Sequence, residues 1–345
     1  MIIWAIVPAH NEELVISQTI RSLQNQTVKP QRIIVIVDNC SDLTEKVARF
    51  ERAETFVTKN NKHKKAGAYN QFLQSVGRHE VDFLLLMDAD TILAKNAIEV
   101  GIEHFQDQRV AAVCSKAGVQ ELQGHHNFFE KFIYRLQKIE YGLYDSQRIE
   151  TYDHIKVVHG MAALHRWRCL KEAGLFNEDC ITEDYYLTLI YKKLGYLVVP
   201  ELKMKAWTSV PVNALELCNQ RIRWNRGGID ALRELGWNKG TYKDILMHIW
   251  GNFVNIVLFY VYIRWISYMI DIERYQITYH WLILFIIIFY LYDRIYRIRK
   301  YVDNMEKKDW FIVFSLIPEM IYGQLQTTIL YISYVKSLMK TNKNW

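Results

Sequence analysis

The sequence predicts an α/β domain with a doubly wound, mostly parallel sheet over residues 1–240, followed by a membrane region over residues 241–345. Two observations support this division. In the first part, unbroken apolar runs of strand length alternate with segments of helical pattern, which is typical of parallel strands joined by helices. The second part holds the longest hydrophobic stretches, although the mean hydropathy of the whole chain is only −0.09. We therefore expect one cytoplasmic domain attached to a multi-pass region in the plasma membrane.

The first strand is expected at residues 2–8, where an apolar run ends at a proline. This run lacks a basic start and is too short for the apolar stretch of a signal peptide, so we expect the domain to stay in the cytoplasm. Further strands are expected at Ile33–Val37, Phe83–Met87, Val110–Val113 and Tyr196–Val199, and helices at Glu12–Gln24, Leu43–Arg49 and Ala66–Val76.

Acidic clusters directly follow two of these strands, at residues 38–42 and at residues 88–90. Ligands of open α/β sheets bind beyond the carboxyl ends of the strands, so both clusters should face one crevice. The carboxylates of Asp88 and Asp90 suit Mg²⁺ or Mn²⁺, which neutralises a diphosphate leaving group; an ordinary acidic turn is the alternative. Asp38 could bind a nucleoside through its base or ribose, or it could form a turn with its own backbone.

A basic run, residues 62–65, precedes the helix expected from Ala66. Positive charge and free backbone N–H groups at a helix start suit phosphate, while a solvated basic run is the alternative. Further along, Thr182, Glu183 and Asp184 begin a helix that should stop at Gly195. Asp184 could also act as a general base toward an acceptor hydroxyl, and both roles are compatible.

Gln220, Arg223 and Trp224 share one face of a predicted helix because they stand at positions i, i+3 and i+4. Arginine binds diphosphate, glutamine bonds to sugar hydroxyls, and an indole offers a flat face to a sugar ring. The alternative is an interfacial helix whose Trp and Arg anchor it before a membrane span.

Hydrophobic segments at residues 245–266, 277–295 and 311–335 are candidate membrane spans. The connection at residues 293–308 is rich in Lys and Arg, which places it on the cytoplasmic side. The third segment could span the membrane, re-enter it or lie at its surface. Residues 128–144 form a basic amphipathic helix, which is typical either of a membrane interface or of a helix packed on its own domain.

The charge and the cysteine content of the chain indicate which partners and which cellular compartment to expect. The formal net charge is +6, and the basic residues cluster near the predicted membrane contacts, which favours anionic lipid over nucleic acid as a partner. The five cysteines are scattered without a C-x-x-C pair, which favours reduced thiols in a cytosolic domain.

Several of these motifs, in this order, resemble family 2 glycosyltransferases. The resemblance is carried by Pro8-Ala9-His10-Asn11-Glu12, Asp38, Lys65-Ala66-Gly67-Ala68-Tyr69-Asn70, Asp88-Ala89-Asp90, Thr182-Glu183-Asp184 and Gln220-x-x-Arg223-Trp224. It is strongest to the processive, membrane-bound branch that contains the poly-N-acetylglucosamine, chitin, hyaluronan and cellulose synthases. It implies a GT-A fold, a UDP-sugar donor and inversion at the anomeric carbon.

The resemblance also implies a role for each matching residue. Donor contacts would come from Pro8, Ala9, Glu12, Asp38, Lys65 and Asp88; the metal would lie at Asp88 and Asp90; the base would be Asp184; and the acceptor and diphosphate end would hold Gly160, Glu183, Gln220, Arg223 and Trp224. Arg166 resembles a further acceptor-side residue. Lys64 departs from the family, which has glycine at this position.

The leading hypothesis is transfer of a sugar, N-acetylglucosamine above others, from a UDP-sugar to a growing β-linked polysaccharide. The branch commonly carries transmembrane helices before the catalytic domain, and none is predicted in residues 1–240, so a polymer product would imply a homo-oligomer or an accessory subunit. Transfer of one sugar to a glycolipid or polyprenyl phosphate is the alternative, and a non-catalytic sugar-nucleotide sensor is a third hypothesis.

Overall fold

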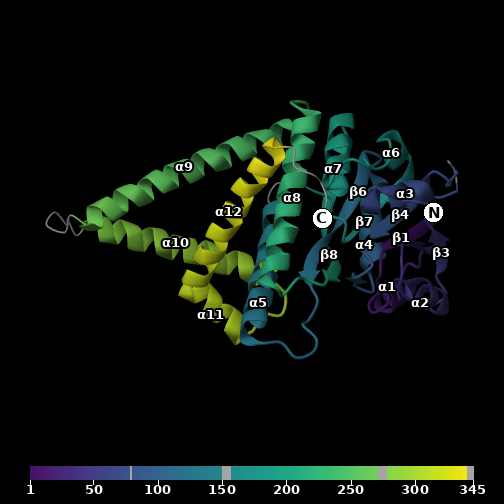
Figure 1. Cartoon of the computed structure of the whole chain (residues 1–345), viewed down its shortest axis with the longest axis horizontal. Coiled ribbons are helices and arrows are strands. Elements are labelled where there is room, and N and C mark those ends of the chain that lie inside the picture. Colours follow the sequence, from purple (N-terminus) through teal and green to yellow (C-terminus); the bar gives the residue numbers. More distant parts are fainter. Residues whose placement is uncertain (78–79, 150–156, 271–277, 340–345) are drawn as a thin grey trace.

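The computed structural model describes residues 1–77, 80–149, 157–270 and 278–339. Within them lies one eight-stranded sheet in the order β3-β2-β1-β4-β7-β6-β8-β5, with helices on both faces and further helices beside it (Figure 1). The strands are β1 (Ile3–Ala9), β2 (Arg32–Val37), β3 (Glu54–Val57), β4 (Phe83–Met87), β5 (Ile92–Leu93), β6 (Val110–Val119), β7 (Ala162–Arg166) and β8 (Leu197–Thr208). The helices are α1 (Ile16–Gln24), α2 (Thr44–Phe50), α3 (Lys64–Leu73), α4 (Ala97–Ile102), the 3-10 helix η1 (Glu103–Gln106), α5 (Phe128–Ile149), α6 (Trp167–Glu172), α7 (Glu183–Leu194), α8 (Ala214–Leu235), α9 (Tyr242–Ile270), α10 (Thr278–Tyr301), α11 (Lys307–Ser315) and α12 (Ile317–Leu338).

The two faces of the sheet carry separate apolar cores. Successive side chains of a strand point to opposite faces, so Val7 of β1 packs with α1, whereas its neighbour Ile6 packs with α3. On the first face, Ile16 and Ile20 of α1 are fully buried, and on the second, Leu73 of α3 is equally buried. Each such side chain contributes roughly 1.5–3 kcal/mol by leaving water. The doubly wound α/β domain predicted from the sequence is confirmed.

Most neighbouring strand pairs are parallel, as predicted, but the sheet also contains antiparallel pairs. β3, β2, β1 and β4 are parallel, but β7 lies between β4 and β6 and runs antiparallel to both. Its sequence ends in His165 and Arg166, which look too polar for a central strand, yet all five residues of β7 are buried. Burial is tolerated because their polar atoms have partners: His165 Nδ1 lies 3.0 Å from the Tyr191 hydroxyl, and Arg166 donates to backbone carbonyls.

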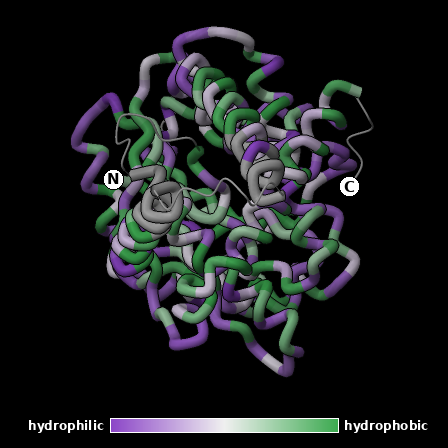
Figure 2. Tube along the Cα trace, turned by 90° about the vertical axis from the view of Figure 1, so that its left-hand side faces the viewer, coloured by the Kyte–Doolittle hydropathy of each residue, from purple (hydrophilic) through white to green (hydrophobic). Residues whose placement is uncertain are grey.

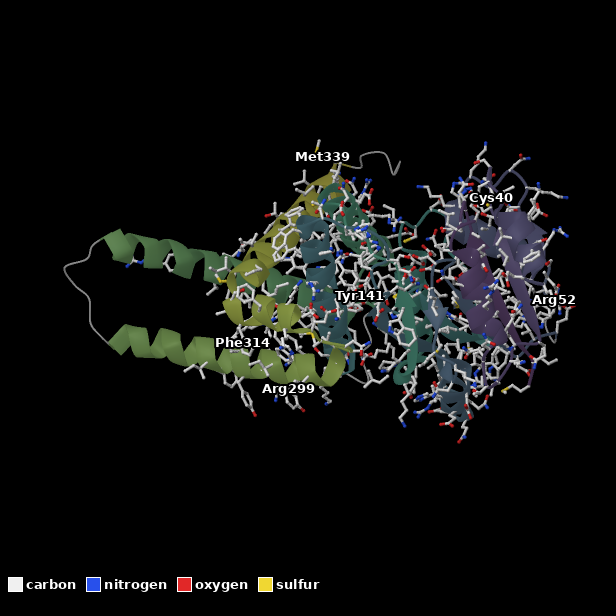
Figure 3. All side chains as sticks on the ribbon, turned by 90° about the horizontal axis from the view of Figure 1, so that it is seen from below. Cys40, Arg52, Tyr141, Arg299, Phe314 and Met339 are labelled. Carbon is white, nitrogen blue, oxygen red and sulfur yellow. The ribbon has the colours of Figure 1, made fainter. Side chains whose placement is uncertain are left out.

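α5 lies between the sheet and the C-terminal helices, where Figure 3 shows Tyr141. Leu136 and Ile139 of α5 pack with Ile298 of α10 and with residues of α11. At its other end, Phe128 is 85% exposed. The apolar stripe of α5 therefore packs partly within the protein, and an interfacial position for its exposed end stays a prediction.

α9 and α10 project away from the sheet, and α12 packs along α8 (Figure 1). Figure 2, viewed from the projecting end, shows hydrophobic and hydrophilic positions interspersed along the trace. Trp250, Phe253 and Ile256 of α9 are each more than half exposed. Among the described residues, no helix has both the length and the apolar character that crossing a membrane requires. The connection expected between the first two hydrophobic segments falls on residues 271–277, which lie outside the described residues.

The third hydrophobic segment forms two helices, not one. α11 ends at Ser315, Leu316 adopts a left-handed φ of 59°, and α12 begins at Ile317 with Pro318 in its first turn. Proline suits the first turn of a helix but ends one that precedes it, which explains the break. The basic connection expected at residues 293–308 is also shorter than predicted, because α10 continues to Tyr301.

Candidate active site

The carboxyl ends of β1, β2 and β4 meet at one edge of the sheet and bring the predicted donor residues together. Pro8 and Ala9 form the end of β1, and Ala9 O accepts a 2.9 Å hydrogen bond from Asp38 N, directly after β2. Glu12 follows in the next turn, where its N–H donates to Thr44 Oγ1 over 2.8 Å. Asp88 follows β4 at the same edge. Both acidic clusters therefore follow strands that end at one edge of the sheet, as expected from parallel strand order.

Asp38 is held rigidly at the base of this crevice. Its Oδ1 accepts hydrogen bonds from Thr58 Oγ1 (2.7 Å) and from Asn61 Nδ2 (2.8 Å), and its side chain is buried. Asn61 also bonds to the Lys64 carbonyl at the start of α3, over 2.7 Å. The bonds of Asp38 fix the carboxylate in place and link it to the basic run, an arrangement that goes beyond a simple local turn.

Lys65, in the first turn of α3, joins the strand-end cluster to α7. Its ammonium forms an ion pair with Asp88 and lies 3.6 Å from Glu183 Oε1. Burial works against the charged amine, but Asp88 and Glu183 outweigh it and hold the pKa of Lys65 well above its usual value. The neighbouring Lys64 has a left-handed φ of 50°, a conformation that favours glycine.

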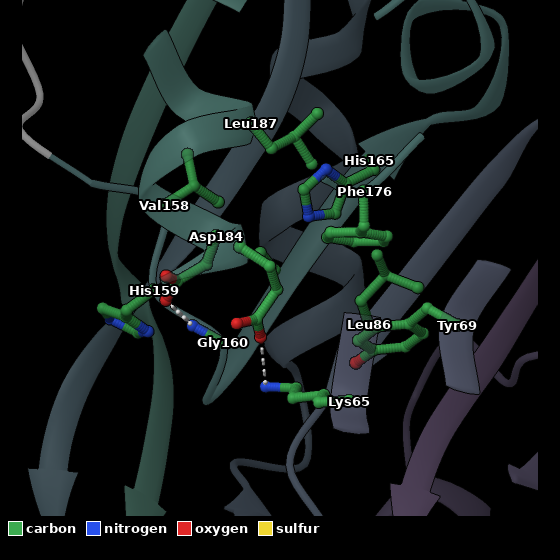
Figure 4. Close-up of a pocket in the computed structure, with 12 residues that line it drawn as sticks. Lys65, Tyr69, Leu86, Val158, His159, Gly160, His165, Phe176, Asp184 and Leu187 are labelled. Carbon is green, nitrogen blue, oxygen red and sulfur yellow. Dashed lines mark hydrogen bonds and ion pairs between the residues drawn. The ribbon is translucent and has the colours of Figure 1, made fainter. Parts of the chain in front are cut away.

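Gly160 fits closely against this ion pair. A methyl group at position 160 would overlap Lys65 Nζ and would lie 3.6 Å from Asp88 Oδ1. The Gly160 N–H donates a 3.0 Å hydrogen bond to Asp184 Oδ2. Glycine at this position therefore lets the backbone, the lysine and the carboxylate meet (Figure 4).

Asp184 stands in the first turn of α7 at a small pocket of about 20 Å³, enough for about one water molecule. Burial, and then the adjacent Glu183 carboxylate, raise the pKa of Asp184 to about 7. Gly195 ends α7 with a φ of 86°, as predicted, but Thr182 makes no side-chain cap bond. Figure 4 shows Lys65, Gly160 and Asp184 converging, with Tyr69 and Phe176 on the pocket wall.

Asp90 and Glu12 complete a group of acids around Asp88. Burial, and then repulsion from Asp90 and Asp88, raise the pKa of Glu12 to about 7. Burial and Asp88 also raise the pKa of Asp90, although Thr208 Oγ1 donates to its Oδ1 over 3.0 Å. Burial is the largest cause of both shifts, and a cation would offset the part that comes from the neighbouring carboxylates.

The carboxylate oxygens of Asp88 and Asp90 are of the ligand type that Mg²⁺ prefers. Among the described residues, no cluster of three or more His, Cys, Asp or Glu side chains is arranged to hold a metal. Mg²⁺ is usually bound through one or two carboxylates together with substrate phosphates, so a site completed by a diphosphate agrees with this arrangement.

α8 carries the Gln220, Arg223 and Trp224 motif. Trp224 is 39% exposed, and Arg223 is exposed near Lys64, whose pKa is lowered by burial and by the Arg223 charge. The charge of Arg223 on α8 therefore acts on Lys64 at the start of α3. Gly227 of the same helix lies so close to Thr182 that no larger residue would fit, and this contact sets α8 against the start of α7.

The motif contains a buried residue that the sequence did not single out. Arg221 has a side chain only 4% exposed, and its guanidinium lies 4.4 Å from the centre of the Trp224 ring. It donates to Glu140 of α5, 81 positions away, over 2.7 Å. The sequence signal for this pair was Glu140, a charged residue within the apolar pattern of residues 128–144.

Arg166 does not join the site, which corrects its assignment to the acceptor side. It stands at the opposite end of β7 from Gly160, where it is buried. Its guanidinium donates to the carbonyls of Phe105 (2.8 Å), Asp107 (3.1 Å) and Val110 (3.1 Å). Arg166 therefore ties β6 and η1 to the central strand.

The fold and the strand-end crevice define the class: this is a GT-A-like α/β domain of the glycosyltransferase type. Its overall arrangement is similar to that of the mannosyltransferase PcManGT from Pyrobaculum calidifontis, with a TM-score of 0.62 and 16% identity over 99% of this chain and 88% of that one. Residues 4–172 match the family model "Glycosyl transferase family 2", so this part of the chain is a domain of that family.

Curated relatives include poly-beta-1,6-N-acetyl-D-glucosamine synthases of two species. The protein from Staphylococcus epidermidis is 24% identical over 276 residues, which cover 77% of this chain and 64% of the relative. That from Staphylococcus aureus strain COL is 25% identical over 232 residues, which cover 66% of this chain and 54% of the relative. The match thus spans a little over half to less than two thirds of the length of these relatives.

Proposed function

We propose that this chain is a membrane-bound inverting glycosyltransferase that moves N-acetylglucosamine from UDP-N-acetylglucosamine to a growing β-linked polysaccharide. The observation that carries the proposal is the position of Asp184. Its carboxylate, with a pKa of about 7, accepts a hydrogen bond from Gly160 N–H beside the Lys65–Asp88 pair. The contact of Gly227 with Thr182 sets α8, which carries the motif, against the start of the helix that holds Asp184. The similarity to poly-N-acetylglucosamine synthases supports the choice of sugar and of product.

In the proposed reaction, Asp184 accepts the proton of an acceptor hydroxyl while that oxygen forms a bond to the anomeric carbon of the donor sugar. The bond from this carbon to the UDP oxygen breaks, and UDP leaves with the bonding electron pair. Attack from the face opposite the leaving group inverts the anomeric carbon and gives a β-linkage. The pKa of about 7 suits a base that must be deprotonated at neutral pH yet still bind a proton.

The donor binds along the strand ends in this proposal. Asp38 accepts hydrogen bonds from the nucleoside, and Pro8 and Ala9 line the floor beside it. Lys65 exchanges part of its contact with Asp88 for the diphosphate, which keeps its charge balanced in a partly buried site. Glu12 lies close enough to Asp88 and Asp90 to feel the charge of both carboxylates.

Asp88 and Asp90 would hold Mg²⁺ or Mn²⁺, with diphosphate oxygens completing the coordination. The ion would supply charge neutralisation of the leaving group. Burial, and then repulsion from Asp88, raise the pKa of Asp90, and a cation would offset the second of these effects.

The acceptor approaches from α8. Trp224 offers its exposed ring face to a sugar, Arg223 faces the diphosphate with Lys64, and Gln220 bonds to a hydroxyl. Two neighbours help to hold the base in place. The Gly160 N–H donates a hydrogen bond to Asp184, and Glu183 contacts Lys65.

We also propose that the catalytic domain lies on the cytoplasmic face of the plasma membrane. Exposed apolar residues on α9, α11 and α12 support contact with lipid: they include Trp250, Phe253, Phe311, Phe314 and Met320. We further propose a homo-oligomer or an accessory subunit as the partner in making a polymer product.

Asp184→Asn tests the proposal. With full-length protein in membranes, UDP-N-acetylglucosamine and Mg²⁺ or Mn²⁺, transfer should fall by roughly 10²–10⁴-fold, because the acceptor hydroxyl loses its base. UDP binding should stay close to that of the wild type. Asp107→Asn is the matched control, since Asp107 pairs with Arg109 at the opposite edge of the sheet. Wild-type turnover in Asp184→Asn contradicts the base assignment, and no UDP release by the wild type from any UDP-sugar contradicts the function.

A second candidate, transfer of one sugar to a lipid, is favoured by a groove of about 390 Å³ between α8, α9 and α12. Its walls are mainly apolar, with Leu232, Ile245 and Ile249 among them, and a polar group of His248, Asn252 and Tyr334 lies at one side. Product size separates the two candidates: a long polysaccharide supports the first, and a single-sugar lipid supports the second.

A further inference from the structure

The side chain of Glu140 connects three helices that are distant in the sequence. It projects from the middle of α5 and receives both a bidentate arginine from α8 and hydrogen bonds from α12. Arg221 donates to its two oxygens over 3.2 and 2.7 Å. Tyr322 OH donates to Oε2 over 2.5 Å, and Gln326 Nε2 donates to Oε1 over 3.4 Å. Every oxygen of this carboxylate therefore has partners from two different helices.

Arg221 carries this restraint into the acceptor motif. Its remaining nitrogen, Nη1, donates to Gln220 Oε1 over 2.5 Å, and its planar group lies 4.4 Å from the Trp224 ring centre. Tyr141, next to Glu140, lies under the same guanidinium at 6.0 Å. One buried cation thus fixes both the amide of Gln220 and the inner face of the Trp224 indole, while the ring remains 39% exposed.

Alternative arrangements of Arg221 are costly. Its side chain is 4% exposed, so the guanidinium depends on Glu140 for charge balance, and a buried ion whose partner is removed is strongly disfavoured. Bidentate pairing also restricts the plane of the guanidinium, which in turn restricts the plane of a ring stacked on it.

We propose that Glu140 is a positioning residue for the acceptor: through Arg221 it orients Gln220 and Trp224, and through Tyr322 it makes that orientation depend on the docking of α12. This inference rests on the proposed function, because it assigns the α8 motif to the acceptor. It predicts that the C-terminal helices control acceptor binding while leaving the donor end, built from strand ends, unaffected.

The test compares Glu140→Gln with a matched control, Asp309→Asn. Asp309 is likewise a carboxylate that links α5 to the C-terminal helices, since it is fully buried and pairs with Arg135 and Lys138 of α5. It lies on α11, away from the α8 motif. Both substitutions keep the size of the side chain and remove one charge, so both weaken helix docking, but only Glu140→Gln releases Arg221.

With full-length protein, UDP-N-acetylglucosamine and a β-1,6-linked N-acetylglucosamine tetrasaccharide as acceptor probe, Glu140→Gln should raise the acceptor KM by roughly 10–100-fold, since a small misplacement of a positioning group is costly. The donor KM and UDP affinity should change less than about threefold. Asp309→Asn should leave both KM values near those of the wild type. Tyr322→Phe, which loses one bond to Glu140 and keeps its ring, should raise the acceptor KM by a few fold.

Equal effects of Glu140→Gln and Asp309→Asn on the acceptor KM, or no effect of either, would overturn the positioning role. If Glu140→Gln does not fold, Tyr322→Phe decides on the same measurement. Amide hydrogen exchange of residues 217–230 gives a readout that needs no activity: it should rise in Glu140→Gln and not in Asp309→Asn. A wild type that releases no UDP refutes the function, whereas unchanged exchange in Glu140→Gln refutes the positioning role by itself.

Discussion

The two ends of the crevice are built in different ways. The donor end consists of short segments that follow β1, β2 and β4, and its key side chains are fixed by nearby partners, such as Asp38 by Thr58 and Asn61. The acceptor end consists of helix surfaces, and Glu140 there bonds to Tyr322, 182 positions further along. The donor end is therefore set by sheet order, whereas the acceptor end depends on how α5, α8 and α12 pack.

Because of this difference, substitutions at the two ends should have different effects. Substitutions at the strand ends should alter nucleotide binding or chemistry with the helices still in place. Substitutions among the helices should alter acceptor use while the nucleotide still binds. Gly160 and Asp184 stand between the two ends and should affect the reaction itself.

Gly160→Ala should have the largest effect of the substitutions that follow. The added methyl group overlaps Lys65 Nζ, which is the end of a flexible side chain, so the protein should fold while the lysine moves away from Asp88. We expect kcat/KM to fall on the order of 10²-fold, because the lysine leaves its position beside the diphosphate. The free energy of unfolding, measured with urea, should change by less than about 1 kcal/mol.

Gly323→Ala in α12 is the control, since a methyl group there meets no atom within 4 Å. Alanine favours a helix over glycine by up to about 1 kcal/mol, so this variant should be as stable as the wild type or slightly more so. Near-normal activity in Gly160→Ala would show that the two ends do not depend on a close contact at this glycine.

The pH dependence should identify the base at the junction. Because Asp184 must be deprotonated to accept a proton and its pKa is about 7, kcat/KM should fall about tenfold for each pH unit below 7. The free energy of unfolding should change in the opposite direction. The pKa of Asp184 is raised from 3.8, so the folded protein holds the proton more tightly, and the contribution of this group to stability decreases as pH rises from about 4 to 7.

Glu12→Gln distinguishes the two carboxyls that titrate near neutrality, since the pKa of Glu12 is also raised to about 7. The acid limb of the kcat/KM profile should persist in this variant, whatever its absolute activity. Loss of the limb would assign the titration to the donor end and would remove Asp184 from its role as base.

Trp224→Ala should have a smaller effect, confined to the acceptor end. Loss of the exposed ring face should raise the acceptor KM by about tenfold, in keeping with a stacking contribution of roughly 0.5–1.5 kcal/mol. UDP affinity, measured by calorimetry, should be unchanged. Trp224→Phe should recover part of the loss, whereas a matching decrease in UDP affinity would place this residue at the donor end.

The same division explains what could be predicted from the sequence. β2 and β4 are apolar runs that end in acids, so the placement of Asp38 and Asp88 at one edge followed from the geometry of parallel strands. The antiparallel β7 could not be predicted in this way, because His165 and Arg166 are buried only through partners distant in the sequence.

The acceptor end shows more clearly how far the site could be predicted from the sequence. Helical spacing placed Gln220, Arg223 and Trp224 on one face, but it gave no reason to expect Arg221 to be buried. That outcome depends on Glu140, which a local pattern cannot connect to α8. Long-range pairing of charges, and not local periodicity, determines this part of the site.

The smallest effect on stability is expected for Phe128→Ser at the exposed end of α5. Phe128 is 85% exposed, so the free energy of unfolding should stay within about 0.5 kcal/mol of the wild type. If the acceptor end faces lipid, binding to vesicles of phosphatidylglycerol and phosphatidylcholine should weaken by roughly 10–100-fold, because burial of a phenylalanine contributes roughly 1.5–3 kcal/mol. Phe50→Ser is the control: Phe50 is the last residue of α2, on a different part of the surface, and is 82% exposed. Flotation of both variants with vesicles compares two surface phenylalanines of equal exposure. Equal binding by the two would mean that α5 does not touch the membrane, and the exposed aromatic end of this helix would then need another partner.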